Sequence, residues 1–197
     1  MRKKTILLFV FDGFADWEPA YALAGISKSD RFKIRTIALD KTPKRSMGGV
    51  AVCPDYDFLP DVDLNDLDNS NVAMLVLPGG VAWEERTNGG IAPLVTHCFE
   101  NQIPVAAICG ATVFLAELGL LNEIEHTSNG LTYLHELAKN YSGGLFYRHV
   151  PSIAAGGIIT AGGVAAIEFA ESIFETLNIR EMESVSGWFR YFEKAEL

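Results

Sequence analysis

Short, almost uninterrupted hydrophobic runs alternate along this chain with longer segments whose apolar residues recur every three or four positions. The runs occupy residues 5–11, 33–39, 72–77, 105–109 and 157–160. Continuous apolar runs of this length are typical of parallel strands buried on both faces, whereas the wider spacing is typical of amphipathic helices. The spacing predicts helices over about 17–28, 91–101, 112–121, 131–141, 165–177 and 183–194.

Other local signals refine this alternation. Gly48–Gly49 lies between β-prone residues and predicts a hairpin within 45–58, while 147–154 predicts a strand that is a candidate for antiparallel pairing. Asp16 is the expected N-cap of the first helix, with Pro19 in its first turn. Alternating strands and helices indicate an α/β fold, a mostly parallel sheet with helices on both faces in three layers. No linker or repeat divides residues 1–197, so we expect a single domain.

Composition narrows the classes of function. The chain has 25 acidic and 16 basic residues, for a formal charge of −9, and lacks a concentrated basic stripe. Nucleic acid is therefore not an expected partner. No run approaches the roughly 20 apolar residues of a membrane span, and the first run ends at Asp12 without a small-residue cleavage site. We expect a soluble, cytoplasmic protein that makes no membrane contact.

The candidate chemistry does not involve a metal or a cofactor. The three cysteines are odd in number, widely spaced and without a CxxC pair, which fits reduced thiols better than a disulfide framework or zinc site. The four histidines form no pair with metal-ligand spacing. The glycine pairs belong to no phosphate-binding pattern. We therefore expect neither a metal nor a cofactor.

Cys109 stands where a buried strand turns into a helix, in the stretch PVAAICGATVFLAELGLL. A sharp strand-to-helix turn projects its apex side chain outward and tolerates only small neighbours, such as Ala107, Gly110 and Ala111. The elbow predicts a positive φ at Cys109, and the helix N-terminus behind it predicts a lowered thiol pKa. The alternative is a small hydrophobe at the end of a strand, which remains the preferred interpretation of Cys53 and Cys98.

Four segments together resemble the ThiJ/PfpI family, which includes a parkinsonism-associated deglycase and has the class I glutamine-amidotransferase-like, flavodoxin-like fold. They are FDGFADWEPA after the first strand, MLVLPGG, AAICGATVFLAELGLL around Cys109, and GGIITAGGVAAIEFAESIFETL. The resemblance covers nearly the whole chain. It implies that Cys109 is the family's reactive cysteine and that Glu18 is the acidic residue that hydrogen-bonds to the thiol. Without the resemblance, Glu18 is equally a first-turn glutamate that complements the helix dipole.

Other residues complete the expected site. The backbone N–H groups of Gly79, Gly80 and Gly110 are candidates for an oxyanion hole, the alternative being an ordinary turn. Trp83 either walls the pocket or covers the core.

The chain departs from the family's histidine pattern. Family proteases place a histidine directly after the cysteine, where this chain has Gly110. Other members carry a histidine about twenty residues further on, where this chain has Asn129, a candidate for oxyanion or substrate binding. The nearest histidine is His126. His126 either reaches the sulfur through a distorted loop or is a partly buried histidine that is hydrogen-bonded near the site.

The leading hypothesis is a cysteine-dependent enzyme that acts on a small amide or carbonyl substrate, as a hydrolase, amidase or deglycase, with Cys109 as nucleophile. The alternatives are a redox-responsive stress protein whose Cys109 is oxidised, and a ligand-binding member without catalysis. The resemblance and the aromatic C-terminal segment 188–197 also predict a homodimer.

Overall fold

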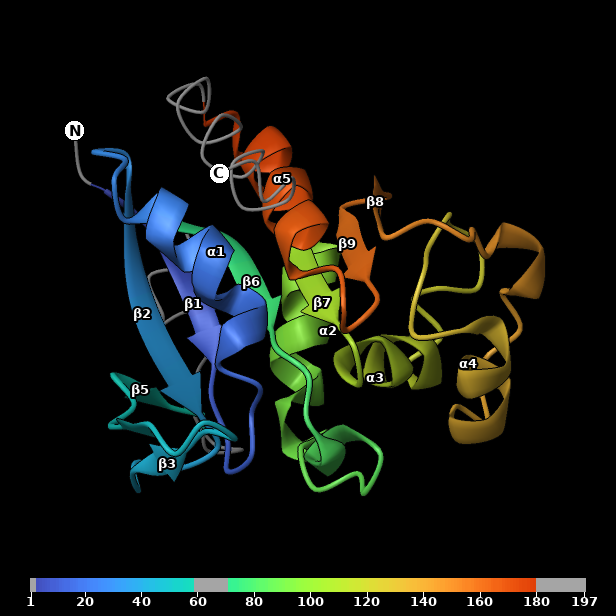
Figure 1. The fold of residues 1–197 in the computed structure, drawn as a ribbon, viewed down its shortest axis with the longest axis horizontal. Coiled ribbons are helices and arrows are strands. Elements are labelled where there is room, and N and C mark those ends of the chain that lie inside the picture. Colours follow the sequence, from blue (N-terminus) through green and yellow to red (C-terminus); the bar gives the residue numbers. More distant parts are fainter. Residues whose placement is uncertain (1–2, 59–70, 180–197) are drawn as a thin grey trace, which may run out of the picture.

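Seven of the described strands form one twisted sheet, in the order β5-β2-β1-β6-β7-β9-β8 (Figure 1). The computed structural model describes residues 3–58 and 71–179, so the predicted helix 183–194 and segment 188–197 lie outside the described residues. Every neighbouring pair in the sheet is parallel except β8–β9. The strands are β1 (Lys4–Phe9), β2 (Phe32–Ala38), β5 (Tyr56–Asp57), β6 (Val72–Leu77), β7 (Val105–Ile108), β8 (Ser152–Ala155) and β9 (Ile158–Ala161).

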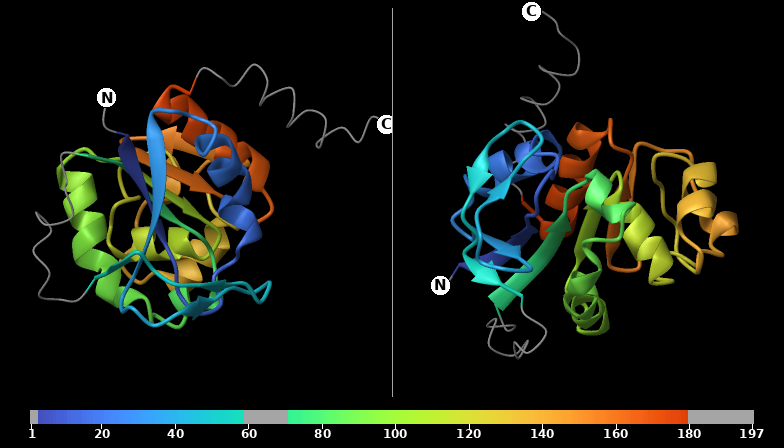
Figure 2. Two further views of the ribbon diagram at one scale, coloured as in Figure 1. Left: turned by 90° about the vertical axis from the view of Figure 1, so that its left-hand side faces the viewer. Right: turned by 90° about the horizontal axis from the view of Figure 1, so that it is seen from below.

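Helices cover both faces of this sheet, which confirms the predicted three-layer α/β architecture. Helices α1 and α5 pack side by side on one face, and α2 lies on the other (Figure 2). The ring of Phe174 fits against Gly25, where a Cβ atom would lie 2.3 Å from the ring. The helices are α1 (Trp17–Ile26), α2 (Ala92–Glu100), α3 (Ala111–Glu117), α4 (Leu131–Leu137) and α5 (Ala166–Leu177), with short 3₁₀ turns η3 (Val81–Trp83), η4 (Gly89–Ile91) and η5 (Gly144–Phe146).

The predicted hairpin is present as β3 (Lys44–Arg45) and β4 (Ala51–Val52), paired antiparallel. Its contact with α1 corrects the predicted role of Asp16, which occupies the N-cap position without a side-chain capping bond. Instead, the Asp16 carboxylate accepts hydrogen bonds from Ser46 Oγ at 2.9 Å and from the Gly48 N–H at 3.2 Å. The carboxylate therefore fastens the hairpin to the loop that enters α1.

Three predicted elements are shorter than expected. Helix α3 ends before Gly119, whose φ of 76° leaves the helical region, and α4 ends where Ala138 becomes extended. The predicted strand 147–154 begins only at Ser152, because Pro151 has no N–H to donate to a ladder. Tyr147 is not part of a strand and forms an isolated β-bridge with His126.

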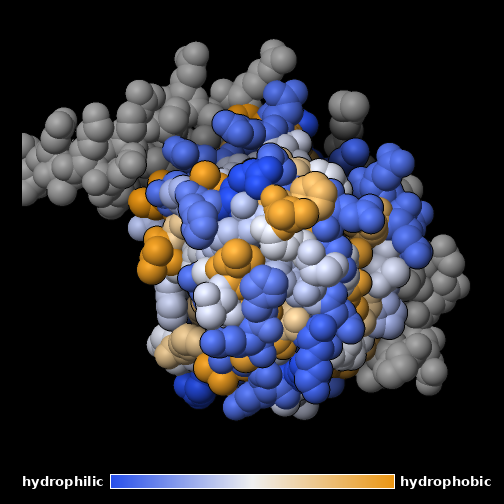
Figure 3. Space-filling view, turned by 90° about the vertical axis from the view of Figure 1, so that its right-hand side faces the viewer, coloured by the Kyte–Doolittle hydropathy of each residue, from blue (hydrophilic) through white to orange (hydrophobic). Residues whose placement is uncertain are grey.

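The core is built from strand residues buried on both faces. Every residue of β7 is buried, as are Phe9 at the end of β1 and Phe169 in α5. Within the described ranges, no helix combines the length and the hydrophobicity needed to cross a bilayer. On the face that carries β8 and α4, hydrophobic side chains are interspersed with hydrophilic ones (Figure 3). That face therefore shows no extended apolar patch.

Strand order places a topological switch at β1. The chain passes from β1 to β2 on one side and later returns as β6 on the other side of β1. In open parallel sheets, ligands bind outside the carboxyl ends of the strands beside such a switch. The segments that follow β1, β6, β7 and β9 at this edge carry Glu18, Gly79, Cys109 and Gly163.

Candidate active site

Cys109 forms a strained elbow between β7 and α3. Its φ is 58°, which confirms the predicted positive φ, in a region that costs a non-glycine residue about 1–3 kcal/mol. Neighbouring groups hold this conformation in place. The Cys109 N–H donates to the Ala161 carbonyl at 3.0 Å, and the Cys109 carbonyl accepts from the N–H and Oγ1 of Thr112 at 3.1 and 2.6 Å.

Glu18 reaches the sulfur from the first turn of α1. The side chain is 1% exposed, and its Oε2 accepts a hydrogen bond from the Gly79 N–H at 2.5 Å. The carboxyl group also lies close enough to the Cys109 thiol for each group to affect the pKa of the other. These contacts require glycine at position 79, because a Cβ there would lie 2.6 Å from Cys109 Cβ and 2.7 Å from Glu18 Oε2.

Asn129 is a second side chain in contact with the sulfur. Its Nδ2 donates to Cys109 Sγ at 3.4 Å, and its Oδ1 accepts from the Gly163 N–H at 2.8 Å. A bond from the Thr127 N–H to Thr160 Oγ1, at 2.9 Å, positions the Asn129 segment against β9. An amide thus takes the place that the family resemblance assigns to a histidine.

The pKa of the Cys109 thiol differs from the prediction. Burial raises the pKa of Glu18 to about 7, against the lowering effect of Gly79 and Cys109. Burial also raises the pKa of the Cys109 thiol, and the negative charge of Glu18 adds to that shift, while Asn129 and the Gly110 N–H oppose it. The predicted lowering of the thiol pKa is therefore wrong. Helix α3 has only seven residues, and its N-terminus does not outweigh burial beside a carboxylate.

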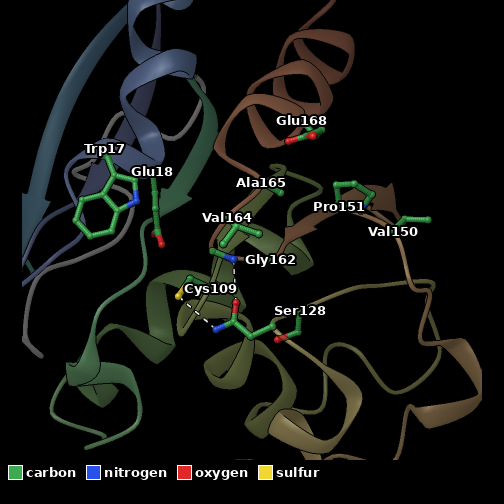
Figure 4. A pocket seen from close by; sticks show the side chains of 12 residues that line it. Trp17, Glu18, Cys109, Ser128, Val150, Pro151, Gly162, Val164, Ala165 and Glu168 are labelled. Atoms are coloured by element: carbon green, nitrogen blue, oxygen red, sulfur yellow. Dashed lines mark hydrogen bonds between the residues drawn. The ribbon is translucent and has the colours of Figure 1, made fainter. Parts of the chain in front are cut away.

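A cleft of about 640 Å³ opens in front of the sulfur. Figure 4 shows the α1 side of the cleft facing the β9–α5 side, with Cys109 at its base. Most of the residues that line this cleft were not predicted from the sequence, because the pairing of β7 with β9 is not visible in either segment alone. The signal that could have indicated them was the Gly162–Gly163 pair after a buried strand. The lining residues are Trp17, Glu18, Cys109, Ser128, Asn129, Val150, Pro151, Gly162, Gly163, Val164, Ala165 and Glu168.

His126 is not a base for the sulfur. The side chain is fully buried, and burial lowers its pKa. Nδ1 lies 2.8 Å from the Ile124 carbonyl and Nε2 lies 2.8 Å from the Tyr141 hydroxyl. Because a carbonyl only accepts, Nδ1 carries the proton and Nε2 accepts from Tyr141. Both nitrogens are thus satisfied away from Cys109, and the interpretation of His126 as a buried structural histidine is the correct one.

The structure also changes the assignment of the oxyanion donors and decides the role of Trp83. The Gly79 N–H is bonded to Glu18 and is not a free oxyanion donor. The remaining candidates are the N–H groups of Gly80 and Gly110, for which no acceptor is found among the described residues. Trp83 belongs to the core: it is 3% exposed, stacks against Phe114 and donates from Nε1 to the Pro78 carbonyl at 2.7 Å.

These contacts give the site a nucleophilic atom, a carboxyl group with a pKa near neutrality and an amide donor around one cleft. A carboxyl group with such a pKa is suited to accept and return a proton at neutral pH. Residues 3–58 and 71–179 contain no group of three or more His, Cys, Asp or Glu side chains arranged to hold a metal ion.

Known proteins are similar to this chain in sequence and in fold. The chain is 30% identical to the uncharacterized protease YoaZ of Bacillus subtilis (strain 168), over 96% of this chain and 91% of that protein. It is 32% identical to the DJ-1 superfamily protein Atu0886 from Agrobacterium tumefaciens, whose crystal structure matches with a TM-score of 0.85 over 96% of this chain and 99% of that one. Residues 4–176 match the DJ-1/PfpI family. The chain therefore belongs to the DJ-1/PfpI family.

Proposed function

We propose that this protein is a cysteine-dependent hydrolase for a small amide or carbonyl compound. The single observation that carries the proposal is the Glu18–Cys109–Asn129 group around a strained elbow that opens into a cleft. Strain of this kind persists only where the surrounding structure over-determines it. The relative YoaZ is named an uncharacterized protease, which agrees with a hydrolytic reaction class.

Glu18 takes the role of the missing histidine in this mechanism. Its carboxylate accepts the thiol proton as Sγ attacks the carbonyl carbon, and the carbonyl π electrons move to the oxygen. Collapse of this tetrahedral intermediate expels the amine, which receives the proton from Glu18 and leaves a thioester on Cys109. Glu18 then takes a proton from water, whose hydroxide attacks the thioester and releases the carboxylic acid and the thiol. A pKa of about 7 suits both directions of transfer.

Asn129 and the backbone amides complete the mechanism. The Asn129 amide holds Sγ toward the cleft, and Gly163 fixes the orientation of that amide. The N–H groups of Gly80 and Gly110 are the proposed donors to the oxyanion. Removal of one such donor typically costs about a hundredfold or more in rate.

A screen of small amides and aldehydes tests the proposal. We expect release of ammonia or amine, or consumption of aldehyde, that disappears in Cys109→Ala. Cys53→Ser is the matched control, because Cys53 is exposed and lies outside the cleft, and it should keep the wild-type rate. Stoichiometric oxidation of Cys109 without turnover of any substrate would instead support the redox-responsive alternative.

We also propose that the protein is a cytoplasmic homodimer. Its three free cysteines suit a reducing compartment. Apolar side chains that remain exposed at the cleft, Val150 and Val164, support burial against a second copy near the site.

A further inference from the structure

The cleft in front of Cys109 is acidic. Its only charged lining residues within the described chain are Glu18 and Glu168, and no Lys, Arg or His side chain lines it. Just outside the lining, Glu84 accepts a hydrogen bond from the Tyr133 hydroxyl at 2.7 Å, and Tyr133 is close enough to Cys109 to sense its charge. A negatively charged substrate would therefore enter a site that offers repulsion and no cationic partner.

Glu168 is the lining charge that remains available to a ligand. It lies in the first turn of α5, is half-buried, and makes no hydrogen bond or ion pair within residues 3–58 and 71–179. Glu18, in contrast, is occupied by Gly79 and Cys109. Beyond its favourable position in the first turn of α5, the Glu168 carboxylate therefore has the capacity to pair with a cation on a ligand.

Trp17 gives the opposite side of the cleft a second group that attracts cations. Its side chain is 50% exposed although it lines the cavity, and Figure 4 shows it on the α1 side, across from Glu168 on α5. The face of an indole ring attracts ammonium and guanidinium groups more strongly than any other side-chain ring. Such exposure is otherwise unfavourable for a large aromatic side chain in the monomer.

We propose that the substrate carries a positively charged group, an ammonium or a guanidinium, near its electrophilic carbon, and that Glu168 and Trp17 are the specificity-determining residues that bind this group. This inference rests on the proposed function of Cys109 as the nucleophile. The formal charge of −9 adds a general attraction for cations during encounter.

Thiol reagents of matched size and different charge test the proposal without a known substrate. The methanethiosulfonates with trimethylammonioethyl, hydroxyethyl and sulfonatoethyl groups each transfer their thioalkyl group to a thiolate and release methanesulfinate. Rates at Cys109 are followed by mass-spectrometric peptide mapping, which separates Cys109 from the exposed Cys53. Each rate is divided by the rate of the same reagent with 2-mercaptoethanol, so that intrinsic reactivity cancels.

We expect the normalised cation-to-anion ratio to be at least about tenfold in the wild type. Glu168→Gln should lower it about fivefold, the scale of one partly exposed charge interaction. Glu175→Gln is the matched control: it removes the same charge from an exposed position about 10 Å further along the same helix, outside the cleft, and should keep the wild-type ratio. Trp17→Leu should lower the cation-to-neutral ratio about threefold.

The outcomes separate the two proposals. A wild-type ratio near one, or an equal loss in Glu168→Gln and Glu175→Gln, would overturn the charge preference while a fast reaction with the neutral reagent left the nucleophile in place. Turnover in the screen that persists in Cys109→Ala would overturn the proposed function, and the charge ratio would still decide the preference of the cleft.

Discussion

At the scale of single residues, the site depends on how closely Gly79 lets two side chains approach. The Gly79 N–H donates a hydrogen bond to Glu18. Because Gly79 has no Cβ, there is room for both Glu18 and Cys109 beside it. Gly163 has a similar role on the other side, where a Cβ would lie 2.8 Å from Cys109 Sγ. Two glycines thus set the distance between the sulfur and its neighbours.

We therefore predict that Gly79→Ala disables the site. The new methyl group must displace Cys109 or Glu18, and a misplacement of about 1 Å lowers the rate about a hundredfold. Overpacking should also lower the free energy of unfolding by roughly 1–3 kcal/mol. Turnover of the substrate found by the screen and chemical denaturation measure the two effects.

The control for this substitution is Gly89→Ala. A Cβ at Gly89 meets nothing within 4 Å, and the glycine lies outside the cleft. This variant should keep the wild-type rate and stability. Equal behaviour of the two variants would contradict the requirement for close approach at Gly79.

The sequence predicted the backbone conformation of Cys109 correctly but not the pKa of its thiol or the position of His126, and the reason is the range of the interactions involved. The elbow at Cys109 follows from its immediate neighbours, so φ could be predicted. Which side chain of the 126–129 segment faces the sulfur depends on the long-range bond between Thr127 and Thr160. The sequence therefore placed Asn129 at the family's histidine position without showing that the amide contacts the sulfur.

At the scale of secondary-structure elements, the buried strands and amphipathic helices were predictable because their hydrophobic period is local. Their ends were less predictable: Gly119 stops α3, and Ala138 stops α4 without a comparable signal. The cleft wall was the least predictable part, because it depends on β9 pairing beside β7, with β8 returning antiparallel. Sheet order of this kind is a property of the whole chain.

At the scale of the whole molecule, we predict a dimer in solution. Val150 and Val164 leave apolar surface at the mouth of the cleft, and a second copy packed near it would reduce that exposure. Light scattering at micromolar concentration should report twice the mass of one chain. A mass equal to one chain would contradict this prediction.

The central claim, that Glu18 controls the ionisation of Cys109, is tested most directly by the pH dependence of Cys109 alkylation with iodoacetamide. The Glu18 carboxylate raises the pKa of the neighbouring thiol, so Glu18→Gln should lower that pKa and increase the thiolate fraction at a given pH. We predict that the alkylation profile of Cys109 shifts to lower pH in Glu18→Gln. The profile of Cys53 in the same sample should not move. A Cys109 profile that is unchanged, or that moves to higher pH, would contradict the account.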